Sequence, residues 1–177
     1  MSRAWIATLL IPCIFVFPVQ ANDTLFTYAQ FAEDLNIRSV EAHDQSRIWS
    51  TCAVIHEVVA MMDDKGPDSP SAKESANQGR GAKLASAMAF IVDYFEDTDS
   101  PDPAAFVSKW RMAAMAMDSN YETVTTSIFS DMKSDPDAFA ERLLPTYGYC
   151  LKILDVQQDY IDLWREMYGS GLLAPVD

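Results

Sequence analysis

Downstream of residue 22, apolar residues recur with helical spacing almost throughout the chain. Between residues 40 and 63 they alternate at intervals of three and four, which forms one stripe of an amphipathic helix. The stripe consists of Ile48, Cys52, Ile55, Val59 and Met62. Nowhere do apolar and polar residues alternate for long enough to predict a strand. The pattern therefore predicts an all-α, single-domain bundle of five or six helices over residues 22–177.

Capping residues and turns divide this pattern into separate helices. A short helix is expected over about residues 24–36, and four later starts are marked by favourable caps. These starts are Ser39, a Ser71–Glu74 capping box, Ser100 with Pro101, and Asp135 with Pro136. In the long fourth helix, residues 118–120 mark a candidate break. Pro145 is expected to end or bend the next helix, and the last helix to carry Tyr147 and Cys150 and stop at Gly169.

The helix expected after residue 71 has two different faces. One face is large and apolar. The other consists of small residues, which let a neighbouring backbone approach closely. These are Ser75, Gly79, Ala82, Ser86 and Ala89. Such a face fits either an internal neighbour or a second copy of the chain, so the sequence leaves the oligomeric state open.

The first 21 residues have the layout of a signal peptide. Arg3 precedes an apolar run, and residues 19–21 fit the small-residue rule for cleavage. The run is shorter than the ~20 residues of a spanning helix, contains Pro12 and Pro18, and precedes no charged stop-transfer cluster. We therefore expect an exported protein, periplasmic or extracellular, that begins at Asn22 and has no stable membrane insertion after cleavage.

The cysteine count supports an oxidising compartment. Lipidation of Cys13 is not expected, because Pro12 occupies the preceding position where a lipobox has a small residue. Cleavage removes Cys13 and leaves two cysteines, Cys52 and Cys150. An even count in an exported chain is typical of a disulfide. Since no C-x-x-C pair is present, we predict a structural bond between the second and last helices.

The charge of the chain is strongly negative. The full sequence has a formal net charge of −13, and loss of Arg3 with the leader lowers it by one to −14. Nucleic acids and anionic membrane surfaces repel such a protein. A basic protein partner, by contrast, would associate quickly and in a salt-dependent manner.

The stretch "HEVVA" at residues 56–60 begins as a zinc-protease helix would. Such a helix needs histidines at i and i+4, so that both reach one metal from the same face. Ala60 occupies the second position, and His43 lies about 220° around the same predicted helix from His56. We therefore predict no metal here, and interpret His56 as a neutral or hydrogen-bonded residue at the border of the core.

The methionines Met112, Met115 and Met117 resemble the thioether spacing that holds Cu(I) in some exported proteins. On a helix, however, Met117 points about 200° away from Met115. Methionine also fills irregular cores without any metal. Core packing is therefore the favoured interpretation, with copper as the alternative.

No recognisable catalytic or cofactor motif occurs in the chain. The acidic stretch at residues 97–108 lacks the glycine and the final acidic residue of an EF-hand. The sequence also has no C-x-x-C-H, no G-x-S-x-G and no phosphate loop. We therefore predict a protein that is not an enzyme and needs no cofactor.

These features together predict an exported binding module. It would neutralise a basic protein partner, in the manner of an inhibitor or an immunity protein. The candidate contacts are Asp63, Asp64, Asp68, Glu96, Asp97, Asp99, Asp102 and Asp118, for which ordinary solubilising charge is an equal alternative. The second hypothesis is a carrier or sensor that binds an apolar ligand or copper between helices. Its pocket would be lined by the three methionines, Trp110 or Trp164.

Overall fold

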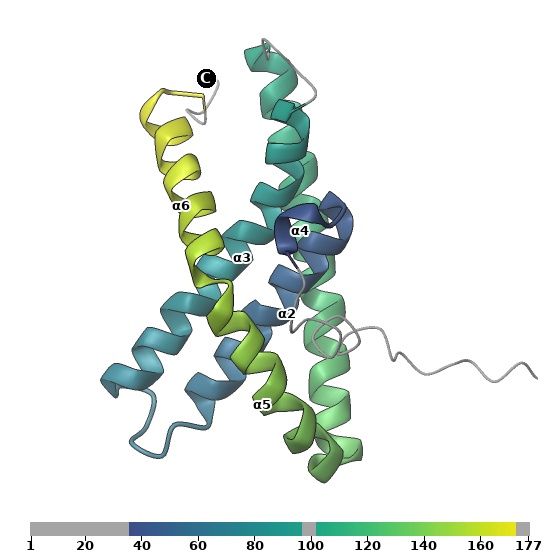
Figure 1. Cartoon of the computed structure of the whole chain (residues 1–177), viewed down its shortest axis with the longest axis vertical. Helices are drawn as coiled ribbons and strands as arrows, with labels where there is room; N and C mark the ends of the chain where they lie inside the picture. The colour runs from purple at the N-terminus through teal and green to yellow at the C-terminus, as the bar shows by residue number, and fades with distance from the viewer. Residues whose placement is uncertain (1–35, 97–101, 173–177) are drawn as a thin grey trace, which may run out of the picture.

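The computed structural model describes residues 36–96 and 102–172. Within these ranges it contains five α-helices, one short 3-10 helix and no strand, which confirms the all-α prediction. The elements are η1 (Ile37–Ser39), α2 (Ala42–Met61), α3 (Pro70–Glu96), α4 (Pro103–Ser134), α5 (Pro136–Lys152) and α6 (Leu154–Gly169) (Figure 1). The expected leader and residues 24–35 of the first predicted helix are not among the residues that the structure describes. None of the described helices is long and apolar enough to cross a membrane.

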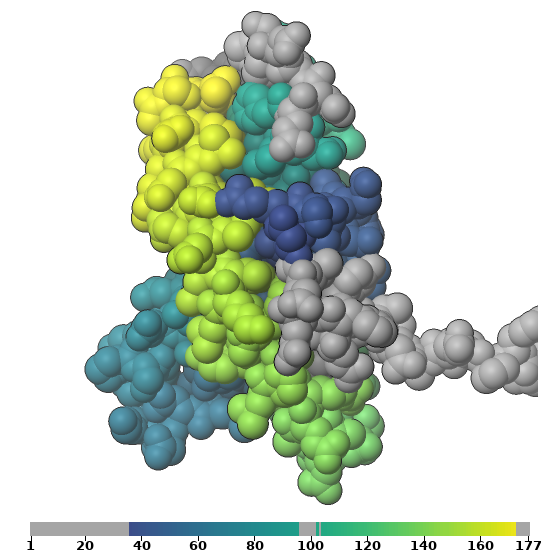
Figure 2. All heavy atoms as spheres, in the orientation of Figure 1, coloured from purple at the N-terminus to yellow at the C-terminus, as the bar shows by residue number. Residues whose placement is uncertain are grey.

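Helix α2 forms the centre of the bundle. Residues 48–56 of this helix are buried without interruption, because α3, α4 and α5 all pack against it. Helix α6 packs mainly on α3. In the space-filling view, α5 and α6 run along one face of the molecule, and the α2–α3 turn projects beside α5 (Figure 2).

The small-residue face of α3 packs against α2. A Cβ on Gly79 would lie only 3.0 Å from the carbonyl oxygen of Ala53, and Ser86 lies opposite Ser46 and Ser50. The two helices are therefore antiparallel and in close contact. An internal neighbour, rather than a second copy of the chain, covers this face.

Buried hydroxyl groups join α2, α3 and α4. The Oγ of Ser86 lies 2.7 Å from the Oγ of Ser46 and 3.0 Å from that of Ser50. Asn120 reaches in from α4 and donates from Nδ2 to the Oγ of Ser46 at 2.9 Å. Because these polar atoms bond to one another, they can be buried without an unpaired donor or acceptor.

The apolar core consists of two clusters. The larger draws on α2, α3, α4, α5 and α6 and includes Trp49, Met88, Ile91, Phe106 and Tyr160. The smaller lies between α2, α4 and α5 and comprises Val54, Ile55, Val58, Val124, Ile128, Phe139 and Leu143. Helix α2 contributes to both clusters, so it connects the two halves of the bundle.

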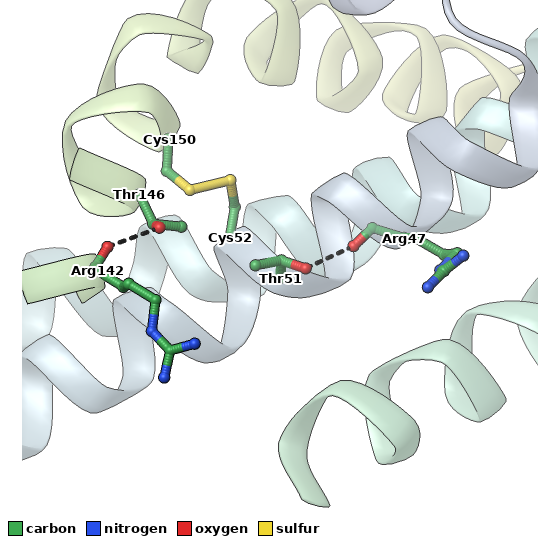
Figure 3. Close-up of a disulfide and its surroundings, with 6 residues drawn as sticks. All are labelled: Arg47, Thr51, Cys52, Arg142, Thr146 and Cys150. Atoms are coloured by element: carbon green, nitrogen blue, oxygen red, sulfur yellow. Dashed lines mark hydrogen bonds between the residues drawn. A yellow bond between two sulfur atoms is a disulfide. The ribbon is translucent and has the colours of Figure 1, made fainter. Parts of the chain in front are cut away.

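A disulfide joins Cys52 and Cys150 (Figure 3). Both residues are buried, so the predicted bond is confirmed. The bond joins α2 to α5, however, and not to the last helix as predicted. The helix that carries Cys150 ends before Ile153, and α6 begins after it. On either side of the bond, the hydroxyls of Thr51 and Thr146 donate back to backbone carbonyls one turn earlier.

Of the predicted helix starts, those of α2, α3 and α4 are wrong in detail. Ser39 does not cap α2; it lies in η1, and its hydroxyl donates to the carbonyl of Asn36. Helix α3 is capped by Ser69, whose Oγ accepts from the backbone N–H of Ala72 at 3.0 Å. Ser71, the predicted cap, instead donates to the carboxylate of Asp63 at 2.5 Å. With Ser69 as the cap, Pro70 occupies the first helical position of α3, where proline is favoured.

The starts of α4 and α5 follow the same cap-and-proline rule. Asp102 caps α4, two residues later than predicted, and Asp135 caps α5 as predicted. Helix α4 is continuous through residues 118–120, so the candidate break is absent there.

Pro145 does not end its helix, which was one of the two outcomes predicted for it, and α5 continues to Lys152. Proline removes the hydrogen bond to the carbonyl of Glu141. Since both residues are exposed, water can bind that carbonyl, which lowers the cost of the missing bond.

Candidate functional site

An apolar groove lies between the C-terminal half of α3 and the N-terminal half of α4. Its volume is about 270 Å³. Helix α3 contributes Phe90, Asp93 and Tyr94, and α4 contributes Lys109, Met112, Ala113 and Ala116. Spacings of three and four place each set on one side of its helix. Because two of the α4 positions are alanines, the facing aromatic rings leave space between the helices.

Aromatic and charged contacts hold the walls of the groove. Near its end, the rings of Phe95 from α3 and Phe106 from α4 have centroids 5.6 Å apart. The Nζ of Lys109 lies 5.4 Å from the centroid of the Tyr94 ring. Asp93 supplies a negative charge among the lining residues. The groove thus combines an apolar floor with one charge of each sign.

The methionine stretch contributes to the edge of this groove rather than to the core alone. Met112 lines the groove, and both Met112 and Met115 are largely exposed. Only Met117 packs partly buried against the larger core cluster. The expectation of core packing is therefore wrong for the first two residues. Met117 points away from the pair, as its position on the helix predicted.

The other candidates for lining a pocket lie outside the groove. Trp110 and Trp164 are half-buried and pack against the larger core cluster. The ring of Trp164 stacks on Tyr168 with centroids 5.6 Å apart. Neither tryptophan is among the residues that line the groove.

A second cleft, of about 260 Å³, opens at the start of α2. Its lining includes Arg38, Glu41, Gln45, Asp93 and Tyr160. The hydroxyl of Tyr160 donates to Gln45 Oε1 at 2.7 Å, and Gln45 Nε2 donates to the carbonyl of Val40 at 2.6 Å. This polar cleft is adjacent to residue 36, where the described chain begins.

His56 lies inside the protein and not at the border of the core. Its side chain is fully buried, and the Tyr147 ring packs edge-on against it at a centroid distance of 5.3 Å. Neither ring nitrogen has a hydrogen-bond partner among the described residues. Burial lowers the pKa of His56 to about 4, so the ring is neutral at physiological pH. Within the described ranges, no group of three His, Cys, Asp or Glu residues is placed to hold a metal.

Glu57, the neighbour of His56, binds an aromatic residue of α4. The hydroxyl of Tyr121 donates to its carboxylate at 2.5 Å. Burial, and then this contact with Glu57, raises the pKa of Tyr121 to about 12. The Nζ of Lys83 on α3 lies 4.3 Å from the centroid of the Tyr121 ring and 3.4 Å from Asp118. The cluster connects three helices, and no spacing within one helix could have indicated it.

Several predicted acidic contact residues have local partners. Asp63 accepts from Ser71 and from the backbone N–H of Lys65, and the bond from Ser71 is the main reason that its pKa is lowered. Asp68 pairs with Lys73 at 3.1 Å.

The remaining acidic candidates differ in their surroundings. Asp102 caps α4, and Asp118 pairs with Lys83. Asp64 is exposed. The side chain of Glu96, and the whole of Asp97 and Asp99, lie outside the description. Local roles therefore account for part of the acidic surface.

Comparison with protein-family models, curated proteins and solved structures found no match to this chain.

Proposed function

We propose that this chain is an exported, acidic binding module whose α3–α4 groove holds apolar side chains of a basic protein partner. The observation that carries the proposal is the groove itself, which has an apolar floor and a volume of about 270 Å³. Sites for small molecules usually measure about 300–1,000 Å³. A space at or below this range suits one or two side chains of a protein.

The rim of the groove supports a protein partner for a second reason. Met112 leaves a flexible apolar side chain exposed at the groove, and Met115, which does not line the groove, is exposed about one turn later on α4. Methionine adapts its shape to different surfaces and is used for this purpose at binding sites. The partner would bury this rim together with the floor.

The charge of the chain supports a basic partner. The net charge, −13 for the full sequence and −14 without the leader, would attract such a protein from a distance. Asp93, at the groove, would then face a cationic side chain beside the apolar contact. Because salt screens long-range attraction within about 10 Å at 0.1 M, association should weaken as salt rises.

Export is part of the same proposal. The first 21 residues have the layout of a signal peptide. The Cys52–Cys150 disulfide is compatible with an oxidising compartment outside the cytoplasm. The partner should therefore be sought in the cell envelope or the culture fluid.

The experiment is an affinity capture from these fractions at low and high salt, with three baits. They are the wild-type protein from Asn22 onward, an Ala116→Trp variant that fills the groove, and an Ala140→Trp control. Ala140 is exposed on α5, so the control adds the same ring away from the groove. Circular dichroism and thermal unfolding verify that all three baits are folded.

Wild type and control should recover the same basic protein, with less of it at high salt. Burying one apolar side chain contributes about 1.5–3 kcal/mol, so the groove variant should recover at least about tenfold less. Equal recovery by the Ala116→Trp bait would contradict the proposal. Recovery of an apolar small molecule or copper, with no protein, would favour the carrier hypothesis.

A further inference from the structure

The described methionines include an exposed group and a buried group, with Met117 and Met132 of intermediate exposure between them. In the first group, Met112 and Met115 have 62% and 72% of their surface exposed. In the second, Met88 and Met167 are only 0% and 4% exposed. Oxidants reach a thioether only where its sulfur is accessible. Dissolved oxidants should therefore reach the sulfur atoms of the first pair far more readily than those of the second.

We propose that Met112 and Met115 form an oxidation site, and that oxidation of Met112 switches off the α3–α4 groove. Met112 lines the groove directly. Met115 follows three residues later on the same helix, about 60° around the axis, so it lies next to Met112 but is not among the residues that line the groove. The proposed effect on binding rests on the proposed function of the groove, whereas the oxidation site itself does not.

The oxidant would be a peroxide, either hydrogen peroxide or an organic hydroperoxide. The thioether sulfur attacks one peroxide oxygen, the O–O bond breaks and an S–O bond forms. Sulfur loses two electrons, and the peroxide is reduced to water or an alcohol. The product is methionine sulfoxide, which a thiol-dependent sulfoxide reductase converts back to the thioether.

Oxidation changes the character of the groove rim. A thioether is apolar and flexible, whereas a sulfoxide carries a strongly polar S=O group. Burying that group against an apolar partner costs free energy unless it finds a hydrogen-bond donor. The oxidised rim should therefore reject the apolar side chains that the reduced rim accepts. An exported protein would in this way respond to peroxide in its surroundings.

The first experiment maps the oxidation site without any partner. The disulfide-bonded protein from Asn22 onward, with ¹³C-labelled methionine methyl groups, is treated with hydrogen peroxide and followed by NMR. Single Met→Leu variants assign the signals. The Met112 and Met115 signals should convert to sulfoxide at least about tenfold faster than those of Met88 and Met167. If Met112 and Met115 convert no faster than Met88, the oxidation site is overturned.

The second experiment tests the switch with the basic protein captured by the wild-type bait. Peroxide treatment should reduce its recovery by about tenfold or more. For a bait carrying Met112→Leu and Met115→Leu, recovery after the same treatment should equal its own recovery before treatment, because leucine is not oxidised. A control bait carrying Met61→Leu and Met62→Leu should remain sensitive. Its two residues are equally exposed, but they lie at the end of α2.

The results separate failure of the switch from failure of the proposed function. Undiminished recovery by the oxidised wild-type bait would overturn the switch, even if filling the groove at Ala116 still abolishes capture. If the Ala116→Trp bait recovers every captured protein as well as the wild-type bait does, the proposed function fails instead. In that case the NMR experiment on the methionine methyl groups still decides, without a partner, whether Met112 and Met115 form an oxidation site.

Discussion

His56 is expected to make the protein less stable in mild acid. The ring is fully buried, and burial lowers its pKa from 6.5 to about 4. Since the unfolded chain retains the higher pKa, unfolding takes up a proton at any pH between the two values. The stability contributed by neutral His56 is therefore complete above pH 6.5 and is lost progressively as the pH falls to about 4.

The interval between the two pKa values sets the size of this loss. One pH unit corresponds to about 1.4 kcal/mol, so the interval from 6.5 to about 4 corresponds to about 3 kcal/mol. Domains of this size have a free energy of unfolding of about 5–15 kcal/mol, so the loss is a substantial part of the total. A His56→Leu variant keeps similar apolar bulk and cannot take up the proton.

The assay is urea denaturation followed by circular dichroism, with the disulfide intact, from about pH 7 to about pH 4. Carboxylates titrate in wild type and variant alike, so the difference between their free energies of unfolding isolates His56. That difference should change by about 3 kcal/mol across the interval. The control is His43→Gln, at the exposed histidine, which should follow wild type within about 0.5 kcal/mol. A constant difference for His56→Leu would refute the argument that burial keeps this ring neutral.

Two further predictions concern the packing around α2. Replacing both Cys52 and Cys150 by alanine removes a link between residues 98 positions apart. In the chain-entropy model this should lower the free energy of unfolding by about 4–5 kcal/mol in urea denaturation; a loss below about 1 kcal/mol would contradict it. Gly79→Ala should cost about 1–2 kcal/mol in the same assay, because the new Cβ would lie 3.0 Å from the Ala53 carbonyl oxygen. Gly148→Ala is the matched control. It has nothing within 4 Å and should stabilise by about 0.5–1 kcal/mol, so equal effects at the two glycines would contradict the packing.

Local signals in the sequence predicted the helical class and several boundaries correctly. The Asp135 start of α5 is an example, since a cap and a following proline act within one turn. The pairing of Cys52 with Cys150 followed from the cysteine count once the leader was set aside. These features depend on neighbours in the sequence or on composition, so they can be predicted without knowing how the helices pack.

Where two local signals competed, the tertiary structure decided between them. The stretch "SPDP" at residues 100–103 contains two cap-and-proline pairs, and α4 begins at the second of them. Ser69 similarly caps α3 in place of Ser71, which binds Asp63 instead. Competing caps differ by about 1 kcal/mol or less. Contacts with the rest of the fold are large enough to select between them.

The candidate groove and the exposure of its methionines depended on tertiary structure alone. The pairs Phe90 with Tyr94 and Met112 with Ala116 each have helical spacing. Nothing in that spacing indicates that the two pairs face each other. The period of apolar residues records only their angle around one helix axis. Which helix covers that side, and which apolar side chains remain exposed, is decided by the packing of all the helices together.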